Sequence, residues 1–323
     1  MKAIVQDRYG SSDVLELADI DKPTCGDEDV LVKVKAAAVN AGDWYLMRGD
    51  PFLARPMFGG FFRPKVKTLG FDVAGRVEAV GEEVAQFQPG DEVFGDLSEC
   101  GFGAFAEYVC VPASALALKP AAVSFEEAAA VSGAALTALQ GLRDCGQIQP
   151  GQRVLVNGAS GGVGSFAVQI AKALGTSVTA VCSASKLDRV RSLNLDRIID
   201  YTKTDATQTD QPYDLILDVA AYRSVFDYFP ALTPNGTYVL VGGSMHRLVQ
   251  AMLLSLWFSK PDRRKIKCFI AKPNPGDLAL VRDLLSNGKI VPVIDRVYRL
   301  SKVPAAIQQL EQRQVCGKVV IRI

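Results

Sequence analysis

The sequence contains a single histidine, His246, and only two tryptophans among its 323 residues. Histidine is the commonest metal ligand and the usual general base of a catalytic triad, so one histidine leaves almost no room for a His-rich zinc site or a His-based triad. Excess charge is also absent, because 36 lysines and arginines are balanced by 35 aspartates and glutamates. This balance gives no electrostatic reason to expect nucleic acid or an anionic membrane as the main partner, and it favours a small neutral ligand.

Paired cysteines and long apolar runs are missing as well. The seven cysteines are odd in number and scattered, and no two form a C-x-x-C pair, which favours a reducing compartment. The longest apolar-rich run, residues 251–258, is far shorter than the roughly 20 residues that a membrane-spanning helix needs. The opening residues MKAIVQDRYG lack the apolar core of a signal peptide, so we expect a cytoplasmic protein.

The N-terminal part of the chain has the pattern of short β-strands separated by turns. Short strands at this spacing are typical of a small barrel or sandwich. The final residues, 317–323, form another strand-like run that we expect to return to this first domain. The strands expected near the N-terminus cover residues 30–34, 73–80, 92–94 and 106–111.

From about residue 124 onward, helical and strand-like segments alternate. Ser124 followed three residues later by Glu127 is typical of a capping box at the start of an alanine-rich helix. Alternation of strands and helices predicts a doubly wound parallel sheet with helices on both faces. The main strands expected in it cover residues 153–157, 177–181, 213–219 and 237–241.

A glycine-rich turn joins the first of these strands to its helix. Residues 158–164 (GASGGVG) match the dinucleotide fingerprint G-x-G-x-x-G, with Ala159 in the first glycine position. The pattern supplies a tight turn, a backbone position free of a side chain where the pyrophosphate binds, and close packing of helix on sheet. We therefore expect cofactor contacts from Ala159, Ser160, Gly161, Gly162, Val163 and Gly164.

The end of the second strand indicates which nucleotide is bound. An Asp or Glu there would hydrogen-bond the ribose 2′-hydroxyl of NAD, and residues 181–186 (VCSASK) contain no carboxylate. Ser183 can donate a hydrogen bond and Lys186 offers a positive charge to a 2′-phosphate. These residues predict NADPH, with a solvated helix surface as the alternative role of Lys186.

Four more motifs accompany the glycine-rich turn at residues 158–164, namely residues 39–45 (VNAGDWY), 69–77 (LGFDVAGRV), 88–94 (QPGDEVF) and 200–201 (DY). Together the five motifs resemble the medium-chain dehydrogenase/reductase family, and the resemblance covers essentially the whole chain. It implies a GroES-like, β-rich catalytic domain of residues 1–122 and 272–323, and a Rossmann cofactor domain of residues 123–271.

Within this family the zinc alcohol dehydrogenases carry Cys where this chain has Asn40 and His where it has Phe71. They also have a four-cysteine lobe where residues 94–108 of this chain contain only Cys100. Asparagine and phenylalanine cannot supply the thiolate and imidazole that zinc requires, so we expect no metal. The chain resembles the zinc-independent quinone oxidoreductases, which include zeta-crystallin and the chloroplast-envelope quinone oxidoreductase homologues.

This resemblance also implies site residues and an assembly. It places Asn40 and Tyr45 in the substrate cleft and Thr137 against the nicotinamide. It implies a homodimer formed through the last strand of the cofactor sheet, near residues 266–271. Around the rest of the cofactor it places Ser183, Lys186 and Tyr201 at the adenosine 2′-phosphate, and the backbone of Gly242, Gly243 and Ser244 near the carboxamide.

The expected reaction follows from the missing zinc ligands. A simple ketone needs a Lewis acid or proton donor on its oxygen, whereas a quinone or an α,β-unsaturated carbonyl delocalises the charge of an incoming hydride itself. We therefore expect an NADPH-dependent reductase of quinones, enones or enals, with Asn40 as an amide donor and Tyr45 as a hydroxyl donor and ring wall. A capping amide and a packed aromatic are the alternatives for these two residues, and backbone-bonding structural roles are expected of Asp43 and Asp72.

Two other functions stay open. An enoyl-thioester reductase would want cations for coenzyme phosphates, and a non-catalytic NADPH-binding sensor or RNA-binding protein would show no turnover. The apolar residues 251–258, followed by basic residues up to 267, are expected to be buried or to face a subunit rather than a membrane. The cations available to a coenzyme are Arg55, Arg63, Lys65 and Lys67.

Overall fold

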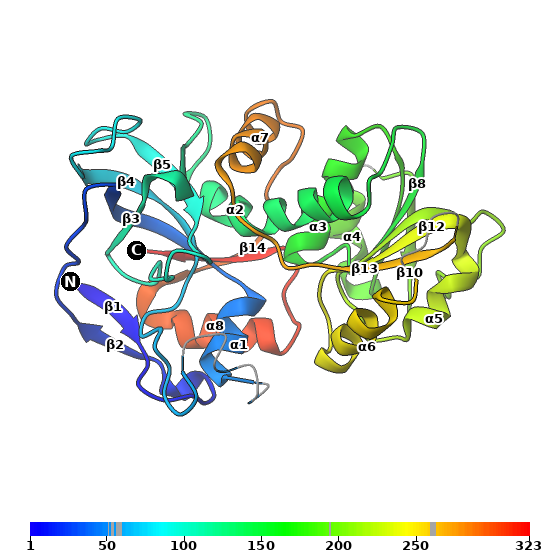
Figure 1. Ribbon diagram of the computed structural model, residues 1–323, viewed down its shortest axis with the longest axis horizontal. Coiled ribbons are helices and arrows are strands. Elements are labelled where there is room, and N and C mark those ends of the chain that lie inside the picture. Colours follow the sequence, from blue (N-terminus) through cyan, green and yellow to red (C-terminus); the bar gives the residue numbers. More distant parts are fainter. Residues whose placement is uncertain (51, 53–54, 56–59, 194, 259–262) are drawn as a thin grey trace. The chain divides into compact units, whose positions relative to one another are not determined.

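A computed structural model describes residues 1–50, 52, 55, 60–193, 195–258 and 263–323 (Figure 1). The chain divides into two compact units. Unit 1 comprises Met1–Gly133, Lys272–Gly288 and Pro292–Ile323, and unit 2 comprises Ala134–Ala271 and Lys289–Val291.

Unit 1 is built around a seven-stranded sheet in the order β14-β15-β3-β4-β5-β7, with β6 paired to β3, and a separate pair of β1 and β2. The C-terminal strand β15 lies between β14 and β3, and only its pairing with β14 is parallel. The strands are β1 (Lys2–Val5), β2 (Glu16–Asp19), β3 (Asp29–Val39), β4 (Asp72–Val80), β5 (Glu92–Asp96), β6 (Tyr108–Pro112), β7 (Leu116–Leu118), β14 (Ile294–Arg299) and β15 (Lys318–Arg322).

Strand β3 is the centre of unit 1. It pairs with β4, β6 and β15, and its valines Val30, Val32 and Val34 are buried in the main hydrophobic cluster. A strand paired on both sides and covered on its faces is expected to be rich in β-branched residues. The helices of this unit are α1 (Ala41–Arg48), α7 (Pro275–Ser286) and α8 (Val303–Glu311), with the first half of α2 (Phe125–Gln140).

Unit 2 contains six parallel strands in the order β10-β9-β8-β11-β12-β13, which confirms the expected Rossmann-like sheet. Strands β9 and β10 lie on one side of β8, and β11, β12 and β13 lie on the other, so the strand order reverses between β8 and β11. Ligands of such sheets bind at the carboxyl ends of the strands beside this switch. Its strands are β8 (Arg153–Asn157), β9 (Ser177–Cys182), β10 (Arg197–Asp200), β11 (Tyr213–Asp218), β12 (Leu232–Leu240) and β13 (Lys265–Cys268). Its helices are α3 (Gly162–Ala173), α4 (Leu187–Arg191), α5 (Val225–Tyr228) and α6 (Met245–Ser255), after the second half of α2 and a π-helical turn at Gly141–Cys145.

The predicted capping box at the start of α2 is confirmed. The Ser124 amide donates to Glu127 Oε2 at 2.9 Å, and the Glu127 amide donates to Ser124 Oγ at 3.2 Å.

The cysteines depart from the expectation of unpaired thiols, because Cys25 and Cys110 form a disulfide in unit 1. Among the described residues, no helix combines the length and apolarity needed to cross a membrane.

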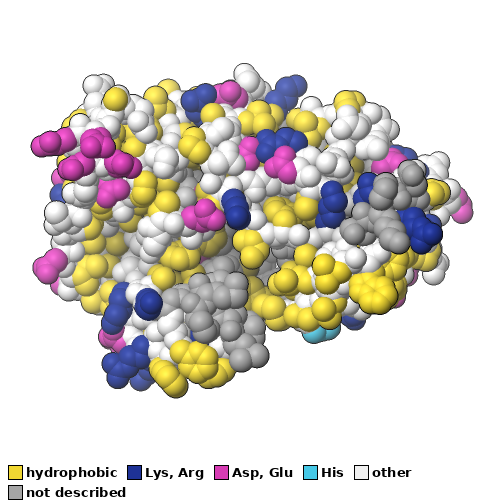
Figure 2. Space-filling model, viewed as in Figure 1, with side chains coloured by type: hydrophobic (Ala, Val, Ile, Leu, Met, Phe, Trp, Pro, Cys, Tyr) yellow, Lys and Arg dark blue, Asp and Glu magenta, His cyan; other side chains and the backbone are white. Residues whose placement is uncertain are grey.

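Helix α6 is apolar on two faces. Leu248, Ala251 and Leu254 pack on the core of unit 2. The opposite face is exposed, and Figure 2 shows hydrophobic side chains gathered over this helix beside the single histidine. Residues 259–262, which precede β13, lie outside the described residues. The α6 stripe comprises the exposed side chains of this face, Val249, Met252 and Leu253, and those of Leu256 and Trp257, which directly follow the helix.

Candidate active site

The fingerprint turn begins where β8 ends. Gly158 has a φ of +83°, and a Cβ there would lie 2.8 Å from the Cβ of Ala220. The amides of Gly158 and Ala159 both donate to the Val181 carbonyl of β9, at 3.1 and 3.0 Å. The turn glycine is therefore Gly158, one residue before the position that the sequence pattern gave to the tight turn, while Ala159 is fully buried.

The other two fingerprint glycines differ in what surrounds them. A Cβ on Gly164 would lie 2.1 Å from the Gly158 carbonyl oxygen, so close packing of α3 on the turn requires glycine there. A Cβ on Gly161 would meet only that same oxygen at 3.4 Å, which leaves the space over Gly161 open. Gly161 caps the twelve-residue α3, whose first amides have no intrahelical acceptor and suit a pyrophosphate. The turn fits a dinucleotide.

A buried hydrogen-bond network supports this turn from below. Asp218, at the end of β11, accepts hydrogen bonds from Tyr238 Oη at 2.6 Å, Asn157 Nδ2 at 2.7 Å and the Ala220 amide at 3.1 Å. Asn157 also donates to the hydroxyl of Tyr228 at 3.0 Å. Burial raises the pKa of Asp218, and the three donors oppose that rise. The network links the ends of β8 and β11, the two strands beside the switch.

The expected adenosine residues gather at one edge of the sheet. Ser183 follows β9, Lys186 lies in the turn after it, and the Tyr201 amide donates to the Cys182 carbonyl at 3.1 Å. Ser183 Oγ lies 3.2 Å from Ser185 Oγ, and the Tyr201 ring is exposed. Asp200 is a carboxylate at the same edge that the sequence reasoning did not weigh, and Thr202 lowers its pKa by a side-chain hydrogen bond.

The Gly242–Gly243–Ser244 segment is fixed by its backbone to the segment after β11. A Cβ on Gly243 would lie 2.5 Å from the backbone of Ala221, so only glycine fits. The Ala221 amide donates to the Gly242 carbonyl at 2.9 Å, and the Ser244 amide donates to the Ala221 carbonyl at 3.1 Å. Ser244 then caps α6. These contacts place the segment at the same carboxyl end as the fingerprint turn.

Thr137 stands out within α2. It is partly exposed, whereas every other residue from Ala128 to Leu142 is buried. Thr137 is thus the one residue between Ala128 and Leu142 that is partly accessible to solvent. Thr137 belongs to unit 2 together with all the other expected cofactor residues.

The candidate catalytic residues lie in unit 1, at the start of α1. The Asn40 amide nitrogen of the backbone donates to Asp43 Oδ2 at 2.8 Å, and this contact fixes the first turn of the helix. The Asn40 side chain donates to the Ala38 carbonyl at 3.1 Å and to Asp72 Oδ2 at 2.9 Å. Tyr45 lies one turn further along α1, partly exposed, with its ring 4.6 Å from that of Trp44. Both amide hydrogens of Asn40 are therefore engaged within the protein, so its side chain has no amide hydrogen left for a substrate.

Lys318, from the first position of β15, completes this cluster. Its ammonium group donates to Asp72 Oδ2 at 2.8 Å and also to Asn40 Oδ1. The side chains of Lys318 and Asp72 are 3% and 0% exposed. The sequence reasoning missed Lys318, and the one available signal was a lysine at the start of an apolar strand.

Two further carboxyl groups lie in the same buried region. Asp43 accepts hydrogen bonds from the backbone of Asn40 and Gly70, and burial raises its pKa to about 7. Asp96 accepts from the Ser98 amide at 2.8 Å, and burial followed by the charge of Asp72 raises its pKa to about 7. Asp43 thus has the expected backbone-bonding role, and Asp96 was not anticipated.

Glycine at position 133 allows this cluster to form. The Gly133 amide donates to Asp72 Oδ1 at 2.7 Å. A Cβ at this position would lie 2.8 Å from Asp96 Oδ2 and 2.9 Å from Asp72 Oδ1. Any side chain here would push the two carboxyl groups away from α2.

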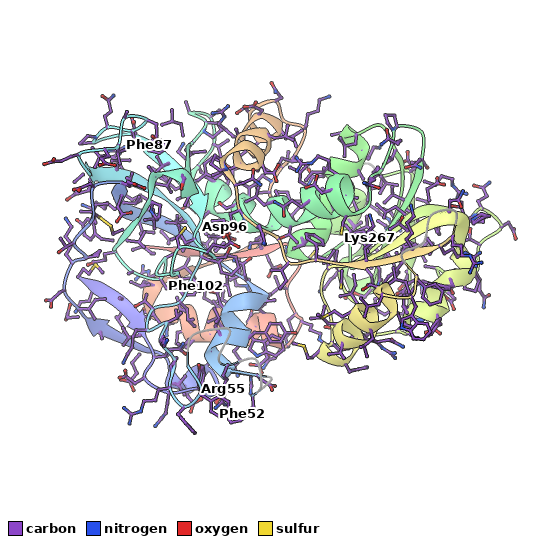
Figure 3. All side chains as sticks on the ribbon, in the orientation of Figure 1. Phe52, Arg55, Phe87, Asp96, Phe102 and Lys267 are labelled. Carbon is purple, nitrogen blue, oxygen red and sulfur yellow. A yellow bond between two sulfur atoms is a disulfide. The ribbon has the colours of Figure 1, made fainter. Side chains whose placement is uncertain are left out.

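Aromatic rings pack beside the cluster. A Cβ on Gly42 would lie 3.0 Å from the Phe71 ring, and Phe71 packs edge-on against Phe102 at 6.2 Å. Phe102 has a φ of +68°, which is rare for an aromatic residue, and it stands between two glycines of positive φ. Figure 3 labels Phe102 and Asp96, both from the segment that begins with β5. Strained backbone of this kind is common near functional sites.

Of the four basic residues expected to attract a coenzyme, Arg55 and Lys67 interact with other groups of the protein. Arg55 Nε donates to the Gly49 carbonyl at 2.8 Å, and its guanidinium lies over the rings of Tyr9 and Phe52 (Figure 3). Lys67 pairs with Asp7. Arg63 and Lys65 are exposed.

The geometry defines a class: an oxidoreductase with a nicotinamide nucleotide domain and a separate β-rich domain that carries polar candidate catalytic residues. Residues 26–121 match the profile described as "Alcohol dehydrogenase GroES-like domain", and residues 193–321 match "Zinc-binding dehydrogenase". The 2-methylene-furan-3-one reductase of Solanum lycopersicum is 36% identical over 332 residues, covering 99% of this chain and 79% of the relative. The chain belongs to the medium-chain dehydrogenase/reductase family, in its quinone oxidoreductase branch.

Two other relatives extend the comparison. The chloroplastic NADPH-dependent alkenal/one oxidoreductase of Arabidopsis thaliana is 34% identical, covering 99% of this chain and 79% of the relative. The structure of the quinone oxidoreductase from Coxiella burnetii has a TM-score of 0.87 and 29% identity, with 100% of this chain and 99% of that chain covered.

The residues at the expected zinc position do not fit zinc, although one matched profile carries zinc in its description. Asn40 Oδ1 and Asp72 Oδ2 already bind the Lys318 ammonium, and Phe71 has no donor atom. Among the described residues, no three or more His, Cys, Asp or Glu side chains are arranged to hold a metal ion. We derive no step through zinc.

Proposed function

We propose that this protein is an NADPH-dependent reductase that transfers a hydride to quinones or to α,β-unsaturated carbonyl compounds. The observation that carries the proposal is the Lys318–Asp72–Asn40 cluster, in which a lysine ammonium takes up the oxygen atoms that a metal would need. Without a Lewis acid, the acceptor itself must delocalise the charge that the hydride brings. Quinones, enones and enals do so.

The cofactor proposal rests on the residues of unit 2. The fingerprint turn fits the pyrophosphate, and Ser183, Lys186 and Tyr201 meet at the sheet edge where the adenosine ribose would lie. Lys186 would pair with the 2′-phosphate, which favours NADPH over NADH. Thr137 and the Gly242–Ser244 backbone would hold the nicotinamide end.

The chemistry divides between cofactor and protein. NADPH supplies the hydride when bound. Tyr45 donates a hydrogen bond to the acceptor oxygen, where negative charge grows during the reaction, and its ring forms a wall for the acceptor. Asn40 fixes the start of the helix that carries Tyr45. The proton that completes the reduction comes from solvent.

The test is oxidation of NADPH and of NADH by the purified protein, with EDTA present, against an ortho-quinone, a 2-alkenal and a 2-enoyl-CoA. We expect turnover of the quinone or the alkenal, with higher kcat/KM for NADPH. Preference for the enoyl-CoA would favour an enoyl-thioester reductase. Cofactor binding without turnover of any acceptor would overturn the proposal in favour of a non-catalytic NADPH-binding protein.

We also propose a homodimer. Strand β13 is at the end of the sheet of unit 2, and α6, which carries the exposed α6 stripe, packs against it. An open strand edge beside an apolar face suits a second copy of the chain. Light scattering that gives a monomer would remove this part of the proposal.

A further inference from the structure

The burial of Lys318 needs an explanation beyond stability. Lysine is almost never fully buried unless it is paired, and here its ammonium is paired with a carboxylate that is itself wholly buried. Replacing a buried ion pair by apolar residues is often neutral or stabilising, so a stable fold does not require this pair. The Lys318–Asp72 ion pair is better explained by the neighbouring side chain that it orients.

Lys318 and Asp72 hold the Asn40 side chain in place. Its Oδ1 accepts from Lys318, and its two amide hydrogens go to Ala38 and Asp72. Each hydrogen-bonding group of the amide therefore has a partner, and one orientation satisfies all of them. Asp72 is fixed in turn by the Gly133 amide.

Asn40 is also hydrogen-bonded to the first turn of α1. The backbone amide of Asn40 donates to Asp43, the Asp43 amide donates back to the Asn40 carbonyl at 3.2 Å, and Tyr45 follows in the same helix. Resting on the proposed function, we propose that Lys318 is a positioning residue for the reduction. Its ammonium fixes the Asn40 amide, and through it the start of α1 and the Tyr45 hydroxyl, in the orientation that the reaction uses.

The test compares Lys318→Met with Lys119→Met. Lys119 is a matched control, because its side chain is also 3% exposed and pairs with a carboxylate, Glu92, away from α1. We expect Lys318→Met to lower kcat by about 100-fold, the scale of a small misplacement of a reacting group, with KM for NADPH within twofold. Lys119→Met should keep kcat within twofold.

Two measurements separate this effect from misfolding and from failure of the proposed function. The double variant Lys318→Met with Asp72→Asn lacks both charges of the ion pair, so it should regain stability relative to Lys318→Met while kcat stays low. In 15N-labelled protein, the side-chain amide signals of Asn40 should shift in Lys318→Met and stay in place in Lys119→Met. This second measurement needs no turnover.

Each possible result supports or overturns the proposed role of Lys318. A folded Lys318→Met with the kcat of the unchanged protein overturns the proposal, and so does an equal loss in Lys119→Met. If the unchanged protein reduces no acceptor, the proposed function fails by itself. Unmoved Asn40 signals would then show that Lys318 does not orient the amide either, whereas shifted signals would show that Lys318 orients the amide even though the reduction itself is not the reaction.

Discussion

At the scale of single residues, burial and charge act together in the polar cluster of unit 1. Three carboxyl groups, Asp43, Asp72 and Asp96, are less than 5% exposed and share one buried cation, Lys318. Burial is the main reason why the pKa values of Asp43 and Asp96 are raised to about 7, and the charge of Asp72 adds to both rises.

Asp96→Asn tests this pKa shift through the pH dependence of stability. The pKa of Asp96 is about 7 in the folded protein, above its ordinary value of 3.8, so the folded state binds more protons between these values and loses stability as pH rises through them. Asparagine keeps an acceptor for the Ser98 amide and does not ionise. Relative to the unchanged protein, the free energy of unfolding of Asp96→Asn should rise by about 2 kcal/mol from pH 5 to pH 7 and change little above that.

Urea unfolding at several pH values measures this difference. Asp210→Asn, at an exposed position, is the control and should give a flat difference. If the difference in free energy of unfolding between Asp96→Asn and the unchanged protein were also independent of pH, Asp96 would be ionised in the folded protein throughout this range.

Lys186→Glu tests the cofactor preference. A carboxylate at this position would remove a charge-assisted hydrogen bond to the 2′-phosphate and repel it, with a combined effect of about 1.5–3 kcal/mol at this partly exposed site. We expect kcat/KM for NADPH to fall by roughly 10- to 100-fold, and kcat/KM for NADH to change by less than about threefold. Equal losses for both cofactors would place Lys186 away from the phosphate. The exposed Lys289→Glu variant controls for overall charge.

At the scale of elements, the ends of β8 and β11 are held by side chains rather than by backbone alone. Tyr238 reaches from β12 to the buried Asp218, which also accepts from Asn157 at the end of β8. Loss of one donor leaves a buried carboxylate short of a partner, which costs more than a surface hydrogen bond. The fingerprint turn follows Asn157 directly, so this network determines how firmly the turn is held.

Tyr238→Phe should therefore lower the free energy of unfolding by about 1–3 kcal/mol and weaken NADPH binding. The chain offers a matched control in Tyr213, which is equally buried but whose hydroxyl has no hydrogen-bond partner among the described residues. Tyr213→Phe should leave stability unchanged or raise it. Denaturant unfolding and NADPH titration by fluorescence distinguish the two variants, and equal losses in both would contradict the network's role.

Much of the fold could be predicted at this scale because its signals are local. The alternation of β8, α3 and β9 and the glycine spacing at 158–164 are all read within a short stretch of sequence. The Lys318 contact with Asn40 joins residues 278 positions apart, and no local pattern marks it. The Asn40 hydrogen bonds likewise depend on β15 and β4 lying on either side of β3, which the sequence pattern does not specify.

At the scale of the whole molecule, α2 is shared by two units that differ in what stabilises them. Unit 2 holds all the proposed cofactor residues, so ligand binding stabilises it by mass action. Unit 1 holds the disulfide between Cys25 and Cys110, which closes a loop of 85 residues. A cross-link of that span stabilises chiefly by restricting the unfolded chain.

These two effects should be separable in one protein. Cys25→Ser with Cys110→Ser should lower the free energy of unfolding by roughly 2–5 kcal/mol, whereas its Kd for NADPH should stay within twofold because all the proposed cofactor residues lie in unit 2. NADPH at about 100 times its Kd should add about 2.7 kcal/mol to each protein. Thermal unfolding with and without NADPH, under non-reducing conditions, gives both quantities. If the double variant bound NADPH tenfold more weakly, the disulfide in unit 1 would be coupled to the cofactor site of unit 2, and the two units could not be treated as energetically independent.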